Sequence, residues 1–251
     1  MKVAFFDSGA GGLTVLKTAS QLLNQQDFIY FADTQHVPYG PKPEVEVRSY
    51  VQSAVDFLAS FQPNALVIAC NTASSLMLDQ LRSKAYPFPI LGMEPAVKLA
   101  SDRLDQAQRL LVTGTQITVR HPHLQQLIEQ FASDYPVDTL ALDQLVTWVE
   151  DEMFDQSIIK RYLSQQIPNP RLYQAVVLGC THFSFYRDHL QDFFGAQTLI
   201  LDGNQGTAKH LIRTLKLKTG QGRNNHYQFY FSGAKDPKQE AKYRRLLQRL
   251  A

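Results

Sequence analysis

The sequence contains only two cysteines, and each of them closes a phrase of the same kind. Ala65–Cys70 reads ALVIAC and is followed by NTAS at 71–74, whereas Ala175–Cys180 reads AVVLGC and is followed by THFS at 181–184. The two phrases align without a gap, about 110 residues apart. A short apolar run that ends in small and polar residues is typical of a buried strand. The sequence therefore predicts two thiols at equivalent strand ends and a single site that is approached from two sides.

Apolar runs alternate with amphipathic segments of helical length, which is typical of parallel sheets covered by helices on both faces. We therefore predict an α/β fold of two similar parallel-sheet domains, with the active site in the cleft between them. The expected strands are Val3–Phe6, Phe28–Ala32, Ala65–Ala69, Pro89–Gly92, Leu110–Thr113, Val137–Leu140, Ala175–Leu178, Thr198–Leu201 and Tyr227–Phe231. The expected helices include Leu13–Leu23, Glu44–Ser60, Ser74–Lys84, Pro95–Leu104, Ile158–Gln166 and Ala208–Leu215.

The domain boundaries are inferred from the places where the alternation of strands and helices is interrupted. Pro95 follows an expected strand and suits the first turn of a helix, so we expect residues 1–94 to form the first domain and residues 95–206 the second. Residues 207–251 are expected to pack back onto the first domain. Their basic end can be read as a nucleic-acid contact, but helical periodicity favours an amphipathic helix. Its packed side would hold Tyr243, Leu246, Leu247 and Leu250.

Composition limits the class of protein and its partners. The chain is 44% hydrophobic and 19% charged, which is typical of a globular protein, and its net charge of +2 is too small to indicate nucleic acid. The first apolar run, Val3–Phe6, is too short for a signal peptide, and no run approaches the roughly 20 residues of a membrane helix. We expect a cytoplasmic protein with reduced cysteines and neither nucleic acid nor membrane as a partner.

Two loops at predicted strand ends are candidates for ligand binding. The glycine-rich turn 7–12 (DSGAGG) opens a helix, where backbone N–H groups favour an anion. A dinucleotide fingerprint would need glycine where Thr14 stands, and Asp7 would repel a pyrophosphate, so we predict a carboxylate-sized anion site or a purely structural bend. The second loop carries Tyr39 and Gly40 toward the crevice where open α/β sheets bind ligands.

The residues after the cysteines indicate chemistry rather than packing. A lone cysteine after an apolar strand is usually a small core residue. Here both are followed by polar residues at expected helix starts, Asn71 and Thr72 in one case and Thr181 and His182 in the other. A helix start can hold a carboxylate, and it would lower the pKa of a thiol.

Several possible functions of the two thiols can be excluded in turn. A redox pair normally forms a C-x-x-C motif, which is absent. Cys180-x-His182 and His121-x-His123 are too sparse for structural zinc, so no metal is expected. A thiol protease would leave the second cysteine idle. Proton transfer at carbon uses both thiols, because one removes a proton from one face while the other delivers a proton to the opposite face.

These phrases resemble glutamate racemases, the cofactor-independent enzymes that supply D-glutamate for bacterial peptidoglycan. The resemblance runs through nearly the whole chain in order. The matching phrases are 6–9 (FDSG), 11–16 (GGLTVL), 33–34 (DT), 37–40 (VPYG), 70–74 (CNTAS), 94–97 (EPAV), 114–115 (GT), 118–119 (TV) and 178–182 (LGCTH).

The resemblance implies a role for individual residues. Cys70 and Cys180 would be the acid/base thiols, the first serving D-glutamate and the second L-glutamate. Asp7 and His182 would tune them, as would Glu150, which can alternatively be read as a solvated acid. The implied substrate-binding residues are Ser8, Tyr39, Gly40, Asn71, Thr72, Thr115, Thr118 and Thr181. It also implies glutamate as the small-molecule substrate, no cofactor, and a homodimer.

The second half departs from the family pattern more than the first. Residues 140–144 read LALDQ where the family carries a Cys-Pro phrase, and 183–186 read FSFY instead of Tyr-Pro-Leu-Leu. A paralogue that racemises aspartate or another amino acid is therefore an alternative. Two further alternatives remain. One is a one-thiol enzyme on the same scaffold, such as a decarboxylase. The other is a two-lobed binding module, which would need an export signal.

Overall fold

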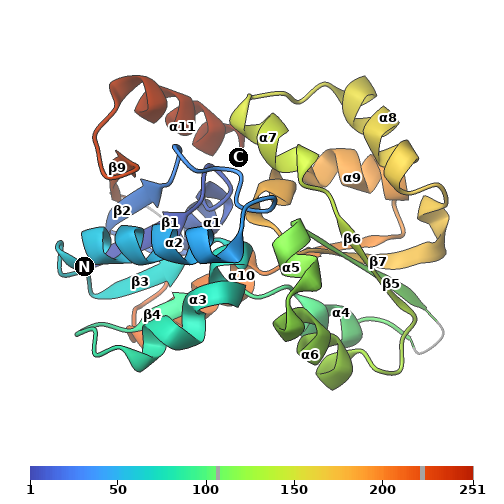
Figure 1. The fold of residues 1–251 in the computed structure, drawn as a ribbon, viewed down its shortest axis with the longest axis horizontal. Helices are drawn as coiled ribbons and strands as arrows, with labels where there is room; N and C mark the ends of the chain where they lie inside the picture. Colours follow the sequence, from blue (N-terminus) through green and yellow to red (C-terminus); the bar gives the residue numbers. More distant parts are fainter. Residues whose placement is uncertain (106–107, 221–223, 251) are drawn as a thin grey trace.

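The fold consists of two parallel sheets, side by side, in a computed structural model that describes residues 1–105, 108–220 and 224–250 (Figure 1). The first sheet has the order β4-β3-β1-β2-β9 and the second has the order β6-β5-β7-β8. The strands of the first sheet are β1 (Lys2–Asp7), β2 (Asp27–Ala32), β3 (Ala65–Ile68), β4 (Ile90–Gly92) and β9 (His226–Phe231). Those of the second are β5 (Arg109–Gly114), β6 (Val137–Ala141), β7 (Tyr173–Leu178) and β8 (Leu199–Asp202). The predicted architecture of two parallel-sheet α/β units is confirmed.

The two sheets repeat one topology. Strands β4, β3, β1 and β2 lie in the same order as β8, β7, β5 and β6, so that β9 is the addition to the first sheet. The registers also agree, since Val3 pairs with Ala65 as Leu110 pairs with Ala175. The repeated cysteine phrase is therefore one visible part of a repeat that extends through each sheet.

Helices cover both faces of the first sheet because its central strand is apolar on both sides. Val3 and Phe5 belong to a core that includes α1 (Leu13–Leu22) and α10 (Asn204–Thr214). Ala4 and Phe6 face the opposite core, which includes α2 (Glu44–Ala59) and α3 (Asn71–Ser83). Strand residues that alternate in this way point to opposite faces of the sheet.

The second sheet is covered in the same manner by a second set of helices. They are α4 (Val97–Ser101), α5 (Gln116–Arg120), α6 (Pro122–Phe131), α7 (Gln144–Glu150), α8 (Gln156–Gln166) and α9 (Arg187–Phe194), with 3-10 helices at Pro170–Leu172 (η1) and Thr181–Tyr186 (η2). Helix α4 is shorter than the expected helix Pro95–Leu104. The N–H of Val97 already bonds to the Pro95 carbonyl oxygen at 2.8 Å, so a tight turn precedes the helix.

The C-terminal segment returns to the first sheet. Strand β9 pairs in parallel with β2, and α11 (Pro237–Arg249) follows it and extends toward α7 of the second unit (Figure 1). Tyr243 and Leu246 of α11 are buried, and Leu247 and Leu250 pack against the same core, as the amphipathic pattern predicted. Among the described residues, no helix is both long enough and apolar enough to span a membrane.

Candidate active site

The two cysteines occupy equivalent positions at the ends of β3 and β7. The residue before each one donates its N–H to the central strand of its sheet, Ala69 to the Phe6 carbonyl oxygen at 2.8 Å and Gly179 to the Thr113 carbonyl oxygen at 2.7 Å. A Cβ on Gly179 would lie 2.4 Å from that oxygen, which explains why glycine stands there. Both thiols are free and buried.

Cys70 lies in a polar but closed environment at the start of α3. Its Sγ is 3.7 Å from Ser8 Oγ, and only 5% of the residue is exposed. Burial raises the pKa of the Cys70 thiol to about 12, with the nearby charge of Asp7 acting in the same direction. The backbone N–H of Ala73 opposes this shift and is outweighed, so the expectation that the helix start lowers this pKa is wrong for Cys70.

Asp7 connects the two thiol regions. Its carboxylate accepts the Gly9 N–H at 2.9 Å and the Thr181 hydroxyl at 3.0 Å, so it joins the turn after β1 to the turn after β7. Complete burial raises the pKa of Asp7, while the His182 ring and these hydrogen bonds oppose the rise. The position of Asp7 brings a titratable group within electrostatic range of both Cys70 and His182.

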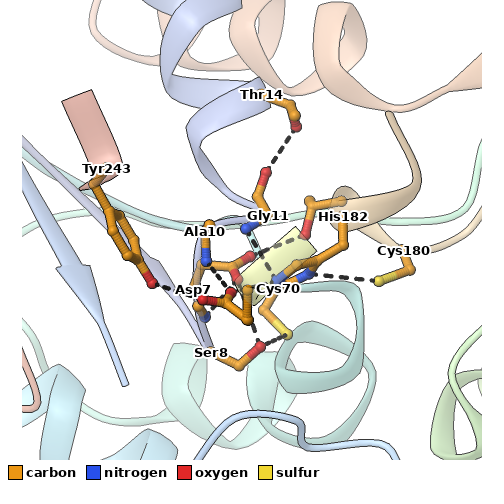
Figure 2. A network of polar contacts seen from close by, with 12 residues as sticks. Asp7, Ser8, Ala10, Gly11, Thr14, Cys70, Cys180, His182 and Tyr243 are labelled. Atoms are coloured by element: carbon orange, nitrogen blue, oxygen red, sulfur yellow. Dashed lines mark hydrogen bonds and ion pairs between the residues drawn. The ribbon is translucent and has the colours of Figure 1, made fainter. Parts of the chain in front are cut away.

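Cys180 faces a histidine that is held by a carboxylate (Figure 2). Its Sγ lies 3.8 Å from Nδ1 of His182, and Nε2 of the same ring lies 2.9 Å from Glu150 Oε1. Nε2 faces the carboxylate, so Nδ1 is the ring atom placed to exchange a proton with the thiol. Burial opposes charge on His182, but the contacts with Cys180 and Glu150 outweigh it and raise the His182 pKa to about 10.

The glycine-rich turn holds a carboxylate of the chain itself. Ala10 donates its N–H to Glu150 Oε1 at 2.6 Å, and the Gly11 N–H lies 3.2 Å from His182 Nε2. A Cβ on Gly9 would lie 2.1 Å from Glu150 Oε1, so a side chain at this position would exclude the carboxylate. The predicted anion site therefore receives Glu150.

Glu150 is a buried member of this network rather than a solvated acid. Only 12% of its side chain is exposed. Burial acts to raise its pKa, but the hydrogen bond and charge of His182, together with Ala10 and Lys242, hold it below its usual value. The carboxylate is therefore ionised where it contacts the histidine.

Three threonine hydroxyls meet at the boundary between the two units. Thr72 of α3 lies 2.8 Å from Thr115 and 3.3 Å from Thr118, measured between hydroxyl oxygens, and the last two are 3.0 Å apart. All three residues are buried. Each hydroxyl offers one proton and two acceptor sites, so this cluster can rearrange to bind a polar ligand.

Tyr39, Gly40 and Asn71 lie around the same boundary. The Tyr39 hydroxyl donates to Asp33 Oδ2 at 2.6 Å, and a Cβ on Gly40 would lie 1.7 Å from Asp143 Oδ1 of the second unit. Asn71 Oδ1 is buried and has no hydrogen-bond partner within the part of the chain that the structure describes. An unpaired buried amide is costly, so this atom is a candidate for contact with a ligand.

The structure thus collects the predicted residues into three neighbouring sets. Asp7, Thr181, His182 and Glu150 form one network with Cys180, while Ser8 contacts Cys70, and the threonines with Asn71, Tyr39 and Gly40 lie at the unit boundary. Asp33, Lys242 and Tyr243 contact predicted site residues but were not themselves predicted as part of the site. Asp33 follows a strand end, which is a usable signal, whereas nothing in the sequence connects Lys242 or Tyr243 to Glu150.

The structure contains a cavity that lies apart from the thiols, and its acidic, histidine and cysteine side chains can also be compared with a metal site. A cavity of about 510 Å³, lined in part by Lys17, Arg103 and Arg187, includes neither cysteine, so its size does not mark the chemistry. Across residues 1–105, 108–220 and 224–250, no group of three or more His, Cys, Asp or Glu side chains is arranged to hold a metal ion.

Known proteins are similar to this chain in sequence. The Asp/Glu/Hydantoin racemase family matches residues 14–211. Glutamate racemase from Halothermothrix orenii is 42% identical over the full length of both chains, and glutamate racemase 2 from Bacillus subtilis is 40% identical over 99% of this chain and 96% of that protein.

Solved structures give the same result. Glutamate racemase from Campylobacter jejuni superposes with a TM-score of 0.83 at 29% identity, covering 99% of this chain and 98% of that one. The Escherichia coli glutamate racemase, solved with L-glutamate and the activator UDP-MurNAc-ala, gives a TM-score of 0.82 at 27% identity, covering 100% and 95%. This chain is therefore an amino-acid racemase that belongs to the Asp/Glu/Hydantoin racemase family and, within it, to the glutamate racemases.

Proposed function

We propose that this enzyme interconverts L- and D-glutamate without a cofactor, using Cys70 and Cys180 on opposite faces of the α-carbon. The observation that carries the proposal is the placement of two buried thiols at equivalent strand ends beside one shared polar network. Relatives named glutamate racemase, about 40% identical over nearly the whole chain, support the choice of substrate.

The proposed reaction moves protons only. In the L-to-D direction, Cys180 as thiolate takes the α-proton, and the electron pair of the broken C–H bond stays on the α-carbon. Cys70 as thiol then gives its proton to the opposite face, which forms the new C–H bond. The burial that raises the Cys70 pKa favours the protonated thiol and so suits it to this donation. The reverse direction exchanges the two roles, and no oxidant or reductant is consumed.

The auxiliary groups restore the thiols for the next turnover. His182 lies within reach of Cys180 through Nδ1 and can take or return a proton. Asp7 is buried with a raised pKa near the Cys70 side, and it can interact in the same way with that thiol. The proposed relay thus has an acid/base partner behind each sulphur atom.

The substrate would be held by side chains that in this structure contact one another or have no hydrogen-bond partner among the described residues. The hydroxyls of Thr72, Thr115 and Thr118 suit a carboxylate, which accepts hydrogen bonds from neutral donors. Asn71 Oδ1 suits the α-ammonium group, which can only donate. Because the threonines come from both units, a bound substrate would draw the units together and exclude water.

The cellular role that follows is the supply of D-glutamate for peptidoglycan. We place the reaction in the cytoplasm, since a mechanism based on two free thiols requires them to stay reduced.

A chirality-resolved assay tests the proposal. Purified protein with no added cofactor should convert either glutamate enantiomer to the racemate and should act far less on aspartate. Cys70→Ser and Cys180→Ser should each lower the rate by at least about a hundredfold, because each removes one acid/base group. Racemisation of aspartate in place of glutamate would overturn the substrate, and near-native activity of either variant would overturn the mechanism.

A further inference from the structure

The carboxylate that holds His182 is itself held by the C-terminal helix. Glu150 Oε1 contacts His182 and Ala10, whereas its other oxygen, Oε2, lies 3.5 Å from Lys242 Nζ and 3.4 Å from the Tyr243 hydroxyl. Both oxygens are therefore engaged from different sides, and the plane of the carboxylate is fixed. These two α11 residues come more than 90 residues after Glu150 and belong to the segment that returns to the first sheet.

We propose that Lys242 and Tyr243 are positioning residues for the second thiol, acting through Glu150 and His182 on Cys180. The inference deepens the proposed function and rests on it, because it assumes that Cys180 transfers a proton. Neither residue contacts a thiol; each instead sets the charge or the orientation of the carboxylate behind the histidine.

Tyr243 supplies orientation. Its side chain is fully buried, with its ring 6.2 Å from that of Tyr30 and edge-on to Phe231 at 5.0 Å between centroids. The hydroxyl of Tyr30 in turn donates to the Gly9 carbonyl oxygen at 2.7 Å. The phenol is therefore locked by packing with its hydroxyl directed at Glu150, and the same aromatic group supports the glycine turn.

Lys242 supplies charge. The ammonium group is close to a carboxylate that is itself nearly buried, with 20% of the Lys242 side chain and 12% of the Glu150 side chain exposed. A cation in this position helps to hold the Glu150 pKa below its usual value, after the larger contributions of His182 and the Ala10 N–H. An ionised Glu150 stabilises the protonated His182 ring, whose Nδ1 faces Cys180.

Flanking contacts fix α11 against the second unit. Arg245 donates to both carboxylate oxygens of Glu152 at 3.2 and 2.7 Å, and the Arg249 guanidinium lies 3.9 Å from the centroid of the Phe154 ring. Lys242, Arg245 and Arg249 thus form one face of the helix, and they meet alternate residues of the segment 150–154. We call this contact the α11 seam.

Loss of Lys242 or Tyr243 should affect proton transfer at Cys180 and not at Cys70, because their contacts lead through Glu150 and His182 to Cys180. Racemisation rates hide such an asymmetry: enantiomers have equal free energies, so kcat/KM is the same in both directions for every variant. Elimination from 3-chloroglutamate avoids this constraint. A thiolate takes the α-proton, a double bond forms as chloride leaves, and the enamine then hydrolyses to 2-oxoglutarate and ammonium. Each α-configuration therefore reports one thiol, with Cys180 serving the L-configured isomers.

The experiment measures this elimination across pH for isomers of both α-configurations. In Lys242→Met we expect kcat for the L-configured isomer to fall about tenfold, a coupling typical of groups in contact, and kcat for the D-configured isomer to stay within about twofold. The acid limb of the L-isomer profile should move to higher pH, because loss of the cation raises the Glu150 pKa. Tyr243→Phe should act in the same direction, and Lys242→Arg should retain the wild-type profile.

Two controls separate positioning from simple helix docking. Arg245→Met breaks another contact of the α11 seam without touching Glu150, and Lys238→Met changes an exposed lysine of the same helix. Both should leave the two profiles unchanged. The inference is overturned if Lys242→Met slows both isomers equally with an unmoved acid limb, or if Arg245→Met reproduces its effect. Wild-type protein that acts on neither isomer and racemises nothing would instead overturn the proposed function.

Discussion

Single glycines decide how closely the two units approach each other. Gly11 lies beneath the second unit, where an added Cβ would be 2.4 Å from both His182 Nδ1 and Thr181 Oγ1. The sequence predicted the turn, but it suggested a ligand in the place that Glu150 occupies. The contact between Ala10 and Glu150 joins residues 140 positions apart, and no local sequence pattern predicts it. The raised Cys70 pKa was also missed, because burial is a property of the folded chain.

Gly11→Ala tests the importance of this close approach. We expect a loss of about 1–3 kcal/mol in the free energy of unfolding, as for other overpacked sites, and a large fall in kcat because His182 must move. Gly206→Ala is a matched control, since nothing lies within 4 Å of its added Cβ. Urea denaturation and steady-state kinetics of both variants give the comparison. Wild-type kcat in Gly11→Ala would show that the contact with His182 is dispensable.

Strands were more predictable than helices at the scale of elements. Buried parallel strands are apolar throughout, and each expected strand is present within a few residues of its predicted bounds. Among the helices, α3 and α10 begin three and four residues before their expected starts, and α4 covers only part of its expected range. Cys70 precedes the α-helix α3, whereas Cys180 precedes the 3-10 helix η2, so the two halves of the repeat differ where the sequence leaves the family pattern. Phe183 and Tyr186 of η2 are buried in the core, which accounts for their aromatic character.

Helix α5 combines a structural and a binding contribution. Thr115 caps it by accepting the Thr118 N–H at 3.2 Å, and the same hydroxyl meets Thr72 of the first unit. Thr115→Val should therefore lower stability by about 1 kcal/mol and raise the KM for glutamate. Asp155→Ala removes the cap of α8 and should cost similar stability with an unchanged KM. An unchanged KM in Thr115→Val would remove this hydroxyl from the proposed substrate site.

The whole molecule is an internal repeat with one addition. We propose a first domain of residues 1–94 with 207–251 and a second of 95–206, although α10 itself begins at Asn204 and runs through the latter boundary. The repeat could be predicted from the cysteine phrase, because matched strand ends carry it. The contact between α11 and Glu150 could not be predicted, because the basic face of a terminal helix has the same sequence pattern whether it faces water or a buried carboxylate.

The central claim is that two different thiols act on opposite faces of one carbon. The most direct measurement follows deuterium at the α-carbon during the first few per cent of conversion of L-glutamate in deuterated water. The account predicts that the D-glutamate formed carries deuterium from the outset, while the remaining L-glutamate retains its proton. D-glutamate that keeps the original α-proton, or early deuterium in both enantiomers alike, would indicate a single base and contradict the account.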